Sequence, residues 1–447
     1  MNRALIFTSS GGNGHKMVAD YLSRELKESS NLSARVDDIM LDYLGDYIGV
    51  KCVDQWNQAQ ANGDINKLNA LVNKQSLANH IFFIPIFLGA LKSLFSLRPR
   101  VVLNTQVMGL RALLCAVALY NLVMKILYLG KWEDIKVETW MSDLPERARH
   151  FYDPIYDTAK WLTKNLVLKV VPPRWEDGSP MDREETIEYI SKRTRLSKNQ
   201  IHLLNENDLP VSKIYKDNTL EAFAPGNQVE LTLKLDYEQK ALTQSLPNIQ
   251  ENYNSTNSAY RINESEKVIT LMLGSQPTKD IVMNTLSILS RKAKYAVGTS
   301  HIFLFCGLDQ GKSLYKEVIA NIKATNLPSN LKIIPLPFQP FDDTAKILTR
   351  SNDRFTRMGG GTIFQFLAEK HTIGERAGRI HLFSESRLSK LQIKRRGTKS
   401  LMKSMVVWER GNAEHAIKAL NAKVVCRATF SKMLKRSIAE PQLPTRL

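Results

Sequence analysis

The chain has 447 residues, 43% of them hydrophobic, and its 62 Lys and Arg against 44 Asp and Glu give a net charge of +18. This length exceeds what one hydrophobic core ordinarily supports, so we expect two domains, and the basic excess favours acidic partners such as nucleotide phosphates or anionic lipid headgroups. The four cysteines are scattered, which argues against a zinc site or a disulfide framework and favours a reducing compartment.

The chain opens with an apolar strand pattern and a glycine-rich turn. Residues 4–8 read as a buried strand, and a helical pattern begins near Lys16. The turn between them contains Gly11, Gly12, Asn13 and Gly14. A strand, a glycine turn and a helix in this order bring bare backbone N–H groups to an anionic ligand. The turn also carries His15 toward the crevice beyond the strand ends, either as a general base or as a group that only orients a ligand.

Two stretches of the first half are unusually apolar. Residues 113–129 include Lys125, and we interpret them as a buried core helix. Residues 80–91 form either a core helix or an amphipathic element that faces a membrane. The first strand starts too early for a cleavable signal peptide, so we expect a cytoplasmic protein; peripheral membrane attachment and export without such a signal are the alternatives.

Strand and helix patterns alternate through residues 1–235, which predicts a Rossmann-like domain around a parallel sheet. Polar residues end two of its strands, at 101–105 and 137–143. Asn104 and Thr105 end the first and are candidates to hydrogen-bond an acceptor, while Asp143 ends the second and is another candidate base. The alternative for each is an ordinary turn or helix-cap residue.

A polar stretch, residues 236–266, follows this domain and reads as a linker or a mobile loop. Strand patterns resume at 268–275, which ends in Gly274 and Ser275. We therefore expect a second Rossmann-like domain over 267–425, and a C-terminal tail over 426–447 that can return to the first domain. The expected fold class is α/β, with two Rossmann-like domains facing a cleft.

A second glycine turn lies in this half of the chain. It consists of Gly359, Gly360, Gly361 and Thr362. Because a helical pattern follows, the turn presents backbone N–H groups to a diphosphate, with Arg357 as an added positive charge; the alternative is an ordinary strand-to-helix turn. Asp342 and Asp343 are adjacent rather than spaced as Asp-x-Asp, so we expect a helix cap there and no metal site.

The order of these motifs resembles that of processive and lipid-linked glycosyltransferases of the GT-B fold. This group includes the monogalactosyldiacylglycerol synthases and the transferase that adds N-acetylglucosamine to the undecaprenyl-linked peptidoglycan precursor. The segments that carry the resemblance are 9–15, 36–40, 142–145, 208–211, 341–343, 356–362 and 411–413. The resemblance implies that Phe341 lies near the uracil ring of a donor, that 356–362 surrounds its diphosphate, and that Asn412 belongs to the nucleotide-sugar pocket.

Three features depart from the pattern of that family. Gln365 stands where the family has a carboxylate that binds ribose hydroxyls, and residues 409–411 replace a glutamine pair that contacts the sugar. The segment 371–410 is longer and more basic than its counterpart. Its Lys and Arg residues form either a solvated surface or a contact with an anionic membrane surface.

The resemblance implies an inverting transfer, with no required metal or other cofactor, from a nucleotide diphosphate sugar to a lipid or membrane-associated acceptor. The donor is expected to be a UDP sugar, bound by the second domain, while the first domain binds the acceptor and supplies the base. No nucleic-acid partner is expected. Two alternatives stay open: a nucleotide-sugar epimerase of the same fold, and a non-catalytic protein that binds anionic lipid or nucleic acid.

Overall fold

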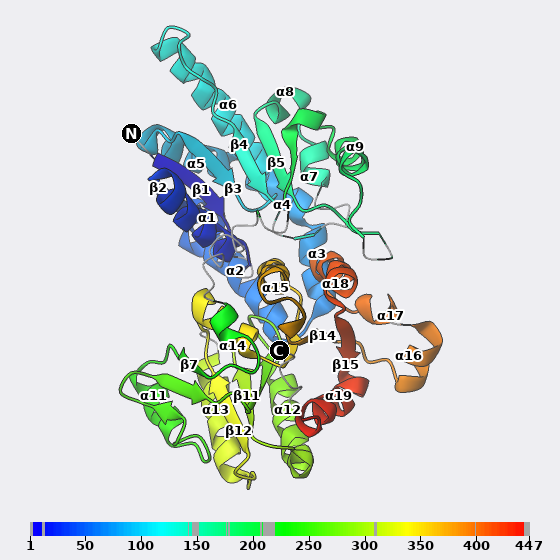
Figure 1. Cartoon of the computed structure of the whole chain (residues 1–447). Helices are drawn as coiled ribbons and strands as arrows, with labels where there is room; N and C mark the ends of the chain where they lie inside the picture. The colour runs from blue at the N-terminus through cyan, green and yellow to red at the C-terminus, as the bar shows by residue number, and fades with distance from the viewer. Residues whose placement is uncertain are drawn as a thin grey trace.

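Two parallel six-stranded sheets form the framework of the chain, one in each of two lobes (Figure 1). The computed structural model describes residues 3–10, 14–141, 143–144, 152–175, 177, 179–205, 208, 220–307, 311–397 and 399–441. The expected α/β class is confirmed, and the two Rossmann-like domains face one another across a cavity. This arrangement is that of the GT-B fold.

The N-terminal sheet has the strand order β2-β1-β3-β4-β5-β6, with all neighbours parallel. Its strands are β1 (Arg3–Thr8), β2 (Ser33–Asp38), β3 (Val101–Asn104), β4 (Val137–Trp140), β5 (Leu166–Val170) and β6 (Ile201–Leu203). Its helices are α1 (Gly14–Ser30), α2 (Leu44–Ala61), α3 (Ile65–Asn73), α4 (Gln75–Ile81), α5 (Phe83–Leu97), α6 (Leu110–Leu127), α7 (Asp153–Tyr156), α8 (Lys160–Thr163) and α9 (Arg183–Thr194). The chain passes from β1 to β2 on one side and then crosses from β2 to β3 on the other side of β1, so the strand order reverses between β1 and β3 and their carboxyl ends flank a crevice where such sheets bind ligands.

The C-terminal sheet has the strand order β12-β11-β10-β13-β14-β15 and is also parallel. Its strands are β10 (Lys267–Met272), β11 (Ser300–Phe305), β12 (Leu331–Leu336), β13 (Asp353–Thr356), β14 (Arg379–Ser384) and β15 (Lys423–Cys426). Its helices are α12 (Lys279–Lys292), α13 (Gly311–Ala324), α14 (Phe341–Arg350), α15 (Gly360–Ile373), α16 (Lys390–Arg396), α17 (Lys399–Met402), α18 (Val407–Leu420) and α19 (Arg427–Ala439). The corresponding crevice lies between β10 and β13, and the second glycine turn joins β13 to α15.

The stretch 236–266 is folded, so the expectation of a linker or mobile loop is wrong. It contains α11 (Tyr237–Gln244), β8 (Tyr253–Asn254) and β9 (Ala259–Ile262), and β9 pairs with β7 (Val229–Thr232) in an antiparallel sheet. Leu246, Ile249 and Tyr260 are fully buried in the core of the C-terminal domain. Its asparagines satisfy backbone groups of tight turns: Asn257 accepts from the N–H of Ala259, and Asn252 donates to the carbonyl of Arg261.

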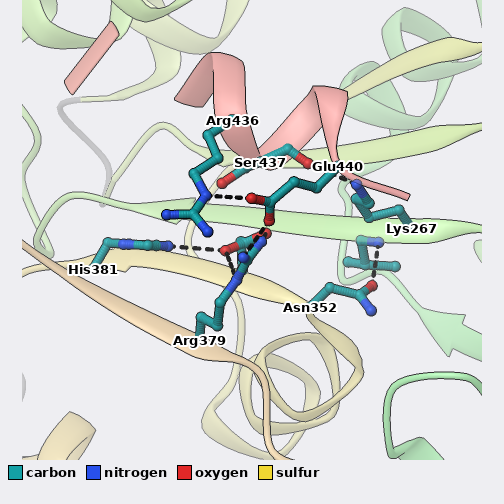
Figure 2. Close-up of polar contacts among 9 residues, drawn as sticks. Lys267, Asn352, Arg379, His381, Arg436, Ser437 and Glu440 are labelled. Carbon is teal, nitrogen blue, oxygen red and sulfur yellow. Dashed lines mark hydrogen bonds and ion pairs between the residues drawn. The ribbon is translucent and has the colours of Figure 1, made fainter. Parts of the chain in front are cut away.

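The described part of the C-terminal tail stays on the C-terminal domain, so the expected return to the first domain does not occur within residues 426–441; residues 442–447 lie outside the described residues. Phe430, Leu434 and Ile438 share one face of α19 and are fully buried in the core of that domain. Figure 2 shows the polar network at the end of the helix. Glu440 accepts from Arg379 and Arg436, and Lys267 Nζ donates to the carbonyl of Ser437 at 2.8 Å.

The apolar stretches of the first half form α5 and α6, which pack against each other. Leu113, Val117 and Tyr120 of α6 are buried, as expected for a core helix. The far end of α6 projects beyond the sheet in Figure 1, and Ile126 and Leu127 are about two-thirds exposed there, at 66% and 65%. Among the described residues, α6 is the one helix long and apolar enough to cross a membrane, and half of its apolar window is buried.

A shared apolar cluster joins the two domains. It contains Val18 and Leu22 from α1 together with Ile363 and Leu367 from α15. In Figure 1, α15 lies at the centre of the molecule, between the two sheets. The first helix of one domain therefore meets the helix that follows the second glycine turn in the other.

Candidate active site

A cavity of about 830 Å³ lies between the two domains. The N-terminal domain contributes the start of α1, the loop after β3, and parts of α2, α3 and α4. The C-terminal domain contributes the loops after β10 and β12, the second glycine turn and the start of α18. A space of this size and position is large enough for a cofactor-sized ligand.

Most of the site residues expected from the sequence line this cavity. They are Gly14, His15, Thr105, Asp143, Gly274, Ser275, Phe341, Arg357, Gly359, Gly360, Gly361, Thr362 and Gln365. Asn104 and Asn412 are fully buried behind it and do not line it. Gly11, Gly12 and Asn13 lie outside the described residues.

Gly14, at the start of α1, lies close to the second glycine turn. A Cβ atom built on Gly14 would lie 3.7 Å from the amide nitrogen of Gly361 and 4.0 Å from that of Gly360. Because α1 begins at Gly14 and α15 begins at Gly360, the positive ends of two helix dipoles converge at this point. The region therefore favours a negatively charged group.

Asp143 is the carboxylate that occupies this region in the structure. It is 7% exposed, and the Gly360 N–H and the Asn412 amide, whose Nδ2 lies 2.9 Å from Oδ1, both donate to it. Burial raises the pKa of the Asp143 carboxyl above its ordinary value, while nearby His15 and these two hydrogen bonds act in the opposite direction.

His15 lies in the first turn of α1 and faces the same space. Its Nδ1 is 2.8 Å from the carbonyl oxygen of Thr105. A carbonyl oxygen only accepts, so Nδ1 carries the proton, and the lone pair of the neutral ring resides on Nε2. The backbone of the loop after β3 thus sets the tautomer of a histidine that is close to Asp143.

Arg357 does not bring a net positive charge to the second glycine turn, contrary to expectation. Its Nε and Nη2 are 3.1 Å from Oε1 and Oε2 of Glu409, and both side chains are buried in the cavity wall. This bidentate ion pair is neutral overall. Stabilisation of an anion beside α15 therefore falls to the backbone N–H groups and the helix dipole.

Gln365 presents a fixed amide to the cavity. Its Nε2 donates to Oε1 of Glu369 at 2.9 Å and to the carbonyl of Ala345 at 3.4 Å. Glu369 is itself held by an ion pair with Arg354 and by the hydroxyl of Thr349 at 3.0 Å. Since a carboxylate only accepts, the amide of Gln365 cannot flip, and Oε1 is the atom that can accept a hydrogen bond from a ligand.

Three further residues predicted to bind a ligand make contacts with other side chains or backbone groups of the protein. The Asn104 amide donates to the carbonyl of Gln106 and to the Thr139 hydroxyl, so it shapes the loop after β3 rather than binding an acceptor. Phe341 packs edge-on against Tyr21 of α1, with ring centroids 4.8 Å apart. The Ser275 hydroxyl lies 3.3 Å from Oε1 of Gln60, which joins the domains.

Sequence patterns did not indicate the second arm of the cavity, which α2, α3 and α4 form. Its apolar walls are Val53, Trp56, Leu71, Val72, Ala78 and Phe82. Trp56 also stacks on Trp408 of α18. The apolar run at 80–91 was the one sequence signal near this arm, but nothing in the pattern related it to the glycine turns.

Outside this arm the same helices expose apolar side chains. Leu77, Ile81, Ile84 and Leu88 are each more than half exposed, and they belong to α4 and α5. Tyr47 of α2 is 79% exposed. The apolar arm and this exposed surface thus share the α4 helix.

Within the described ranges, no group of three or more His, Cys, Asp and Glu side chains is arranged to hold a metal ion. Asp342 forms an ion pair with Arg24 of α1 at 2.7 Å, and Asp343 is in the first turn of α14. The expected helix cap is therefore wrong: Pro340 is the N-cap of α14, no described side chain caps it, and the two carboxylates lie in the first turn, where negative charge interacts favourably with the helix dipole.

No protein-family model and no curated protein sequence matches this chain. Solved structures with a similar arrangement include MurG of Acinetobacter baumannii, at 12% identity and a TM-score of 0.41, covering 98% of this chain and 92% of that one. UGT89C1 of Arabidopsis thaliana, complexed with UDP-L-rhamnose, has 12% identity and a TM-score of 0.45, covering 99% and 91%. A UDP-GlcNAc 2-epimerase of Neisseria meningitidis, bound to UDP-GlcNAc, has 14% identity and a TM-score of 0.40, covering 94% and 100%. None of the three assigns a substrate to this chain.

Proposed function

We propose that this protein is a glycosyltransferase that moves a sugar from a UDP sugar to a lipid or membrane-associated acceptor, with inversion at the anomeric carbon. The observation that carries the proposal is the close approach of Gly14, at the start of α1, to the second glycine turn, in one interdomain cavity that His15 and Asp143 also line; a Cβ built on Gly14 would lie within 4.0 Å of the Gly360 and Gly361 amide nitrogens. The motif resemblance to lipid-linked glycosyltransferases supplies the donor class, the inversion and the absence of a required metal.

The second glycine turn would bind the donor diphosphate. Glycosyl transfer leaves negative charge on the departing diphosphate, and the amide groups at the start of α15 stabilise such charge without rearrangement. Glycine at Gly359, Gly360 and Gly361 lets phosphate oxygens approach the backbone closely. The amide oxygen of Gln365 would accept a hydrogen bond from a ribose hydroxyl, in place of a carboxylate.

His15 would act as the general base. Its Nδ1–H is held by the Thr105 carbonyl, so Nε2 would take the proton of the acceptor hydroxyl as the oxygen attacks the anomeric carbon. The new C–O bond forms on the face opposite the breaking bond to the diphosphate, which inverts the configuration. The negative charge of the nearby Asp143 carboxylate would stabilise the imidazolium that results.

The apolar arm supports an amphipathic acceptor. A lipid acceptor needs an apolar path that ends at the base, and the arm formed by α2, α3 and α4 belongs to the cavity that contains His15. The exposed apolar side chains of α4 and α5 are suited to contact a membrane from which such an acceptor would be drawn. We therefore propose a peripheral membrane position for the N-terminal domain.

The test is release of UDP from a panel of UDP sugars, measured with and without lipid acceptors. We expect His15→Ala to lower kcat by about 10²- to 10⁴-fold. His371→Ala is the matched control, because His371 is exposed at the far end of α15, and it should keep the wild-type rate. Failure of every UDP sugar to bind would overturn the proposal. A sugar product with altered configuration and no acceptor would identify an epimerase instead.

A further inference from the structure

We propose that Asn412 is a positioning residue for Asp143, so that the His15–Asp143 pair is completed only when the two domains close. Asn412 belongs to α18 of the C-terminal domain, whereas Asp143 follows β4 of the N-terminal domain. This inference rests on the proposed function for its catalytic consequence, but the contact itself can be tested without turnover.

The orientation of the Asn412 amide is fixed by its neighbours. The backbone N–H of Leu144 lies 2.7 Å from Asn412 Oδ1, and since an N–H only donates, this oxygen must be the acceptor. The Nδ2 group therefore donates to Asp143 Oδ1 at 2.9 Å and to the carbonyl of Met358 at 3.2 Å. Asn412 is fully buried, so no water competes for these bonds.

The C-terminal domain thus provides two of the groups that stabilise the Asp143 carboxylate. They are Asn412 from α18 and the Gly360 N–H at the start of α15. The third neighbour, His15 of α1, belongs to the same domain as Asp143. When the domains separate, the carboxylate loses both donors at once.

Other charged groups around this contact are paired or more distant. In the described wall of the cavity, Arg357 and Glu409 neutralise each other, and Arg24 pairs with Asp342. His415 lies one turn along α18 from Asn412, beside Leu144 and Tyr152. The ionisation of Asp143 therefore depends first on its burial, which raises its pKa, and then on His15, Asn412 and Gly360, which lower it.

The chemical consequence follows from the role of the carboxylate. Hydrogen bonds from Asn412 and Gly360 favour the charged form of Asp143, which burial opposes. A protonated Asp143 cannot stabilise an imidazolium on His15. His15 would therefore act as an effective base only while the C-terminal domain contacts Asp143. Deprotonation of the acceptor would in this way depend on the domain that binds the donor.

The experiment compares Asn412→Ala and the isosteric Asn412→Asp with Asn69→Ala. Asn69 is the matched control, because its Oδ1 accepts from the Val407 N–H at 3.1 Å and so makes an interdomain bond to the same helix, α18. Asn69 does not contact Asp143 in any hydrogen bond that the structure describes. The ionisation of Asp143 is followed by ¹³C NMR of aspartate-labelled full-length protein, and its signal is assigned by its loss in Asp143→Asn.

We expect the pKa of Asp143 to rise in Asn412→Ala, so that its ionisation constant falls about tenfold, and to rise further in Asn412→Asp, where a second carboxylate faces it. In Asn69→Ala it should stay at the wild-type value. The acid limb of the pH profile of kcat should move upward by the same amount in the Asn412 variants alone. If Asn412→Ala does not fold, the same titration of Asn412→Asp tests whether Asn412 controls the ionisation of Asp143.

An unchanged titration of Asp143 in a folded Asn412 variant overturns the inference. Equal shifts in the Asn412 and Asn69 variants also overturn it, because they would reflect a general loosening of the domain contact. If no UDP sugar is turned over, the proposed function fails, yet the NMR titration still tests whether Asn412 controls Asp143.

Discussion

Trp56 of α2 stacks on Trp408 of α18 across the two domains, with ring centroids 4.8 Å apart and planes inclined by 23°. Both rings line the cavity, and a small apolar cluster with Leu68 and Val406 surrounds them. The N-terminal domain therefore reaches the C-terminal domain through α2 and α3 as well as through α1. Opening of the cavity on this side requires the two indoles to separate.

Removal of one indole should loosen the domain contact. We expect Trp408→Ala to lower the thermal unfolding temperature, because the aromatic pair alone contributes about 1 kcal/mol and the space left behind adds to the loss. The near-UV circular dichroism of the stacked indoles should weaken in parallel. Trp161→Ala is the control, since Trp161 is 64% exposed, and equal unfolding temperatures for the two variants would contradict the prediction.

The fixed amide of Gln365 leads to a prediction about donor binding. We expect Gln365→Ala to raise KM for the UDP sugar about 2- to 10-fold, the range for loss of one hydrogen bond, and to leave kcat nearly unchanged. Steady-state kinetics of UDP release measures both constants. Gln392→Ala on exposed α16 is the control, and a loss confined to kcat in Gln365→Ala would speak against ribose binding.

The exposed apolar side chains of α4 and α5 should mediate membrane binding. We expect the double variant Leu77→Asp and Ile81→Asp to bind vesicles of mixed neutral and anionic lipid at least tenfold more weakly, because it places charge where apolar groups would enter the bilayer. Sedimentation with vesicles measures this. Tyr237→Asp, at a residue 91% exposed on α11, is the control, and equal binding of the double variant and wild type would refute the membrane position.

A histidine–carboxylate pair in the C-terminal domain predicts an acid-sensitive step in stability. His301 Nε2 lies 3.1 Å from Glu266 Oε2, and this contact lowers the pKa of Glu266 to about 2. In the unfolded chain the pKa of a glutamate is about 4.3. A carboxyl whose pKa is lower in the folded state stabilises the protein fully above the unfolded pKa. This stabilisation is lost as the pH falls from the unfolded pKa through the pKa of the folded state.

We therefore expect the unfolding temperature of wild type to fall between about pH 4.3 and pH 2 more steeply than that of Glu266→Gln. Calorimetry at intervals of half a pH unit measures the difference. Glu264→Gln, two residues away, is the control for the general effect of acid. Parallel curves for wild type and Glu266→Gln would contradict the assignment.

Local sequence patterns were sufficient for much of the framework. The strand patterns at 4–8, 101–105 and 268–275 correspond to β1, β3 and β10, because a strand buried on both faces reads as a largely continuous apolar run. The strand β13 was missed for the converse reason. It contains Asp353 and Arg354, and their charges are neutralised by residues distant in sequence, such as Arg379 and Glu369.

In the candidate site, too, local features could be predicted from the sequence, whereas contacts between distant residues could not. The glycine turns and His15 could be predicted because a strand, a turn and a helix are local features. The partner of Arg357 is Glu409, and the partner of Asp143 is Asn412, 269 residues along the chain. No periodicity specifies such pairs. They arise only when the two domains pack together, so the roles predicted for Arg357 and Asn412 changed once their contacts were described.

The position of α19 bears on how such proteins can be recombined. Because this helix stays with the C-terminal sheet, the described chain passes from one domain to the other once, between β6 and β7. Within the described residues, each half is thus a single uninterrupted segment of the sequence. A chimera that exchanges the C-terminal half for that of a protein of the same fold would need one crossover point within the described chain, and the side chains along α1 and α15 would decide whether the new halves fit.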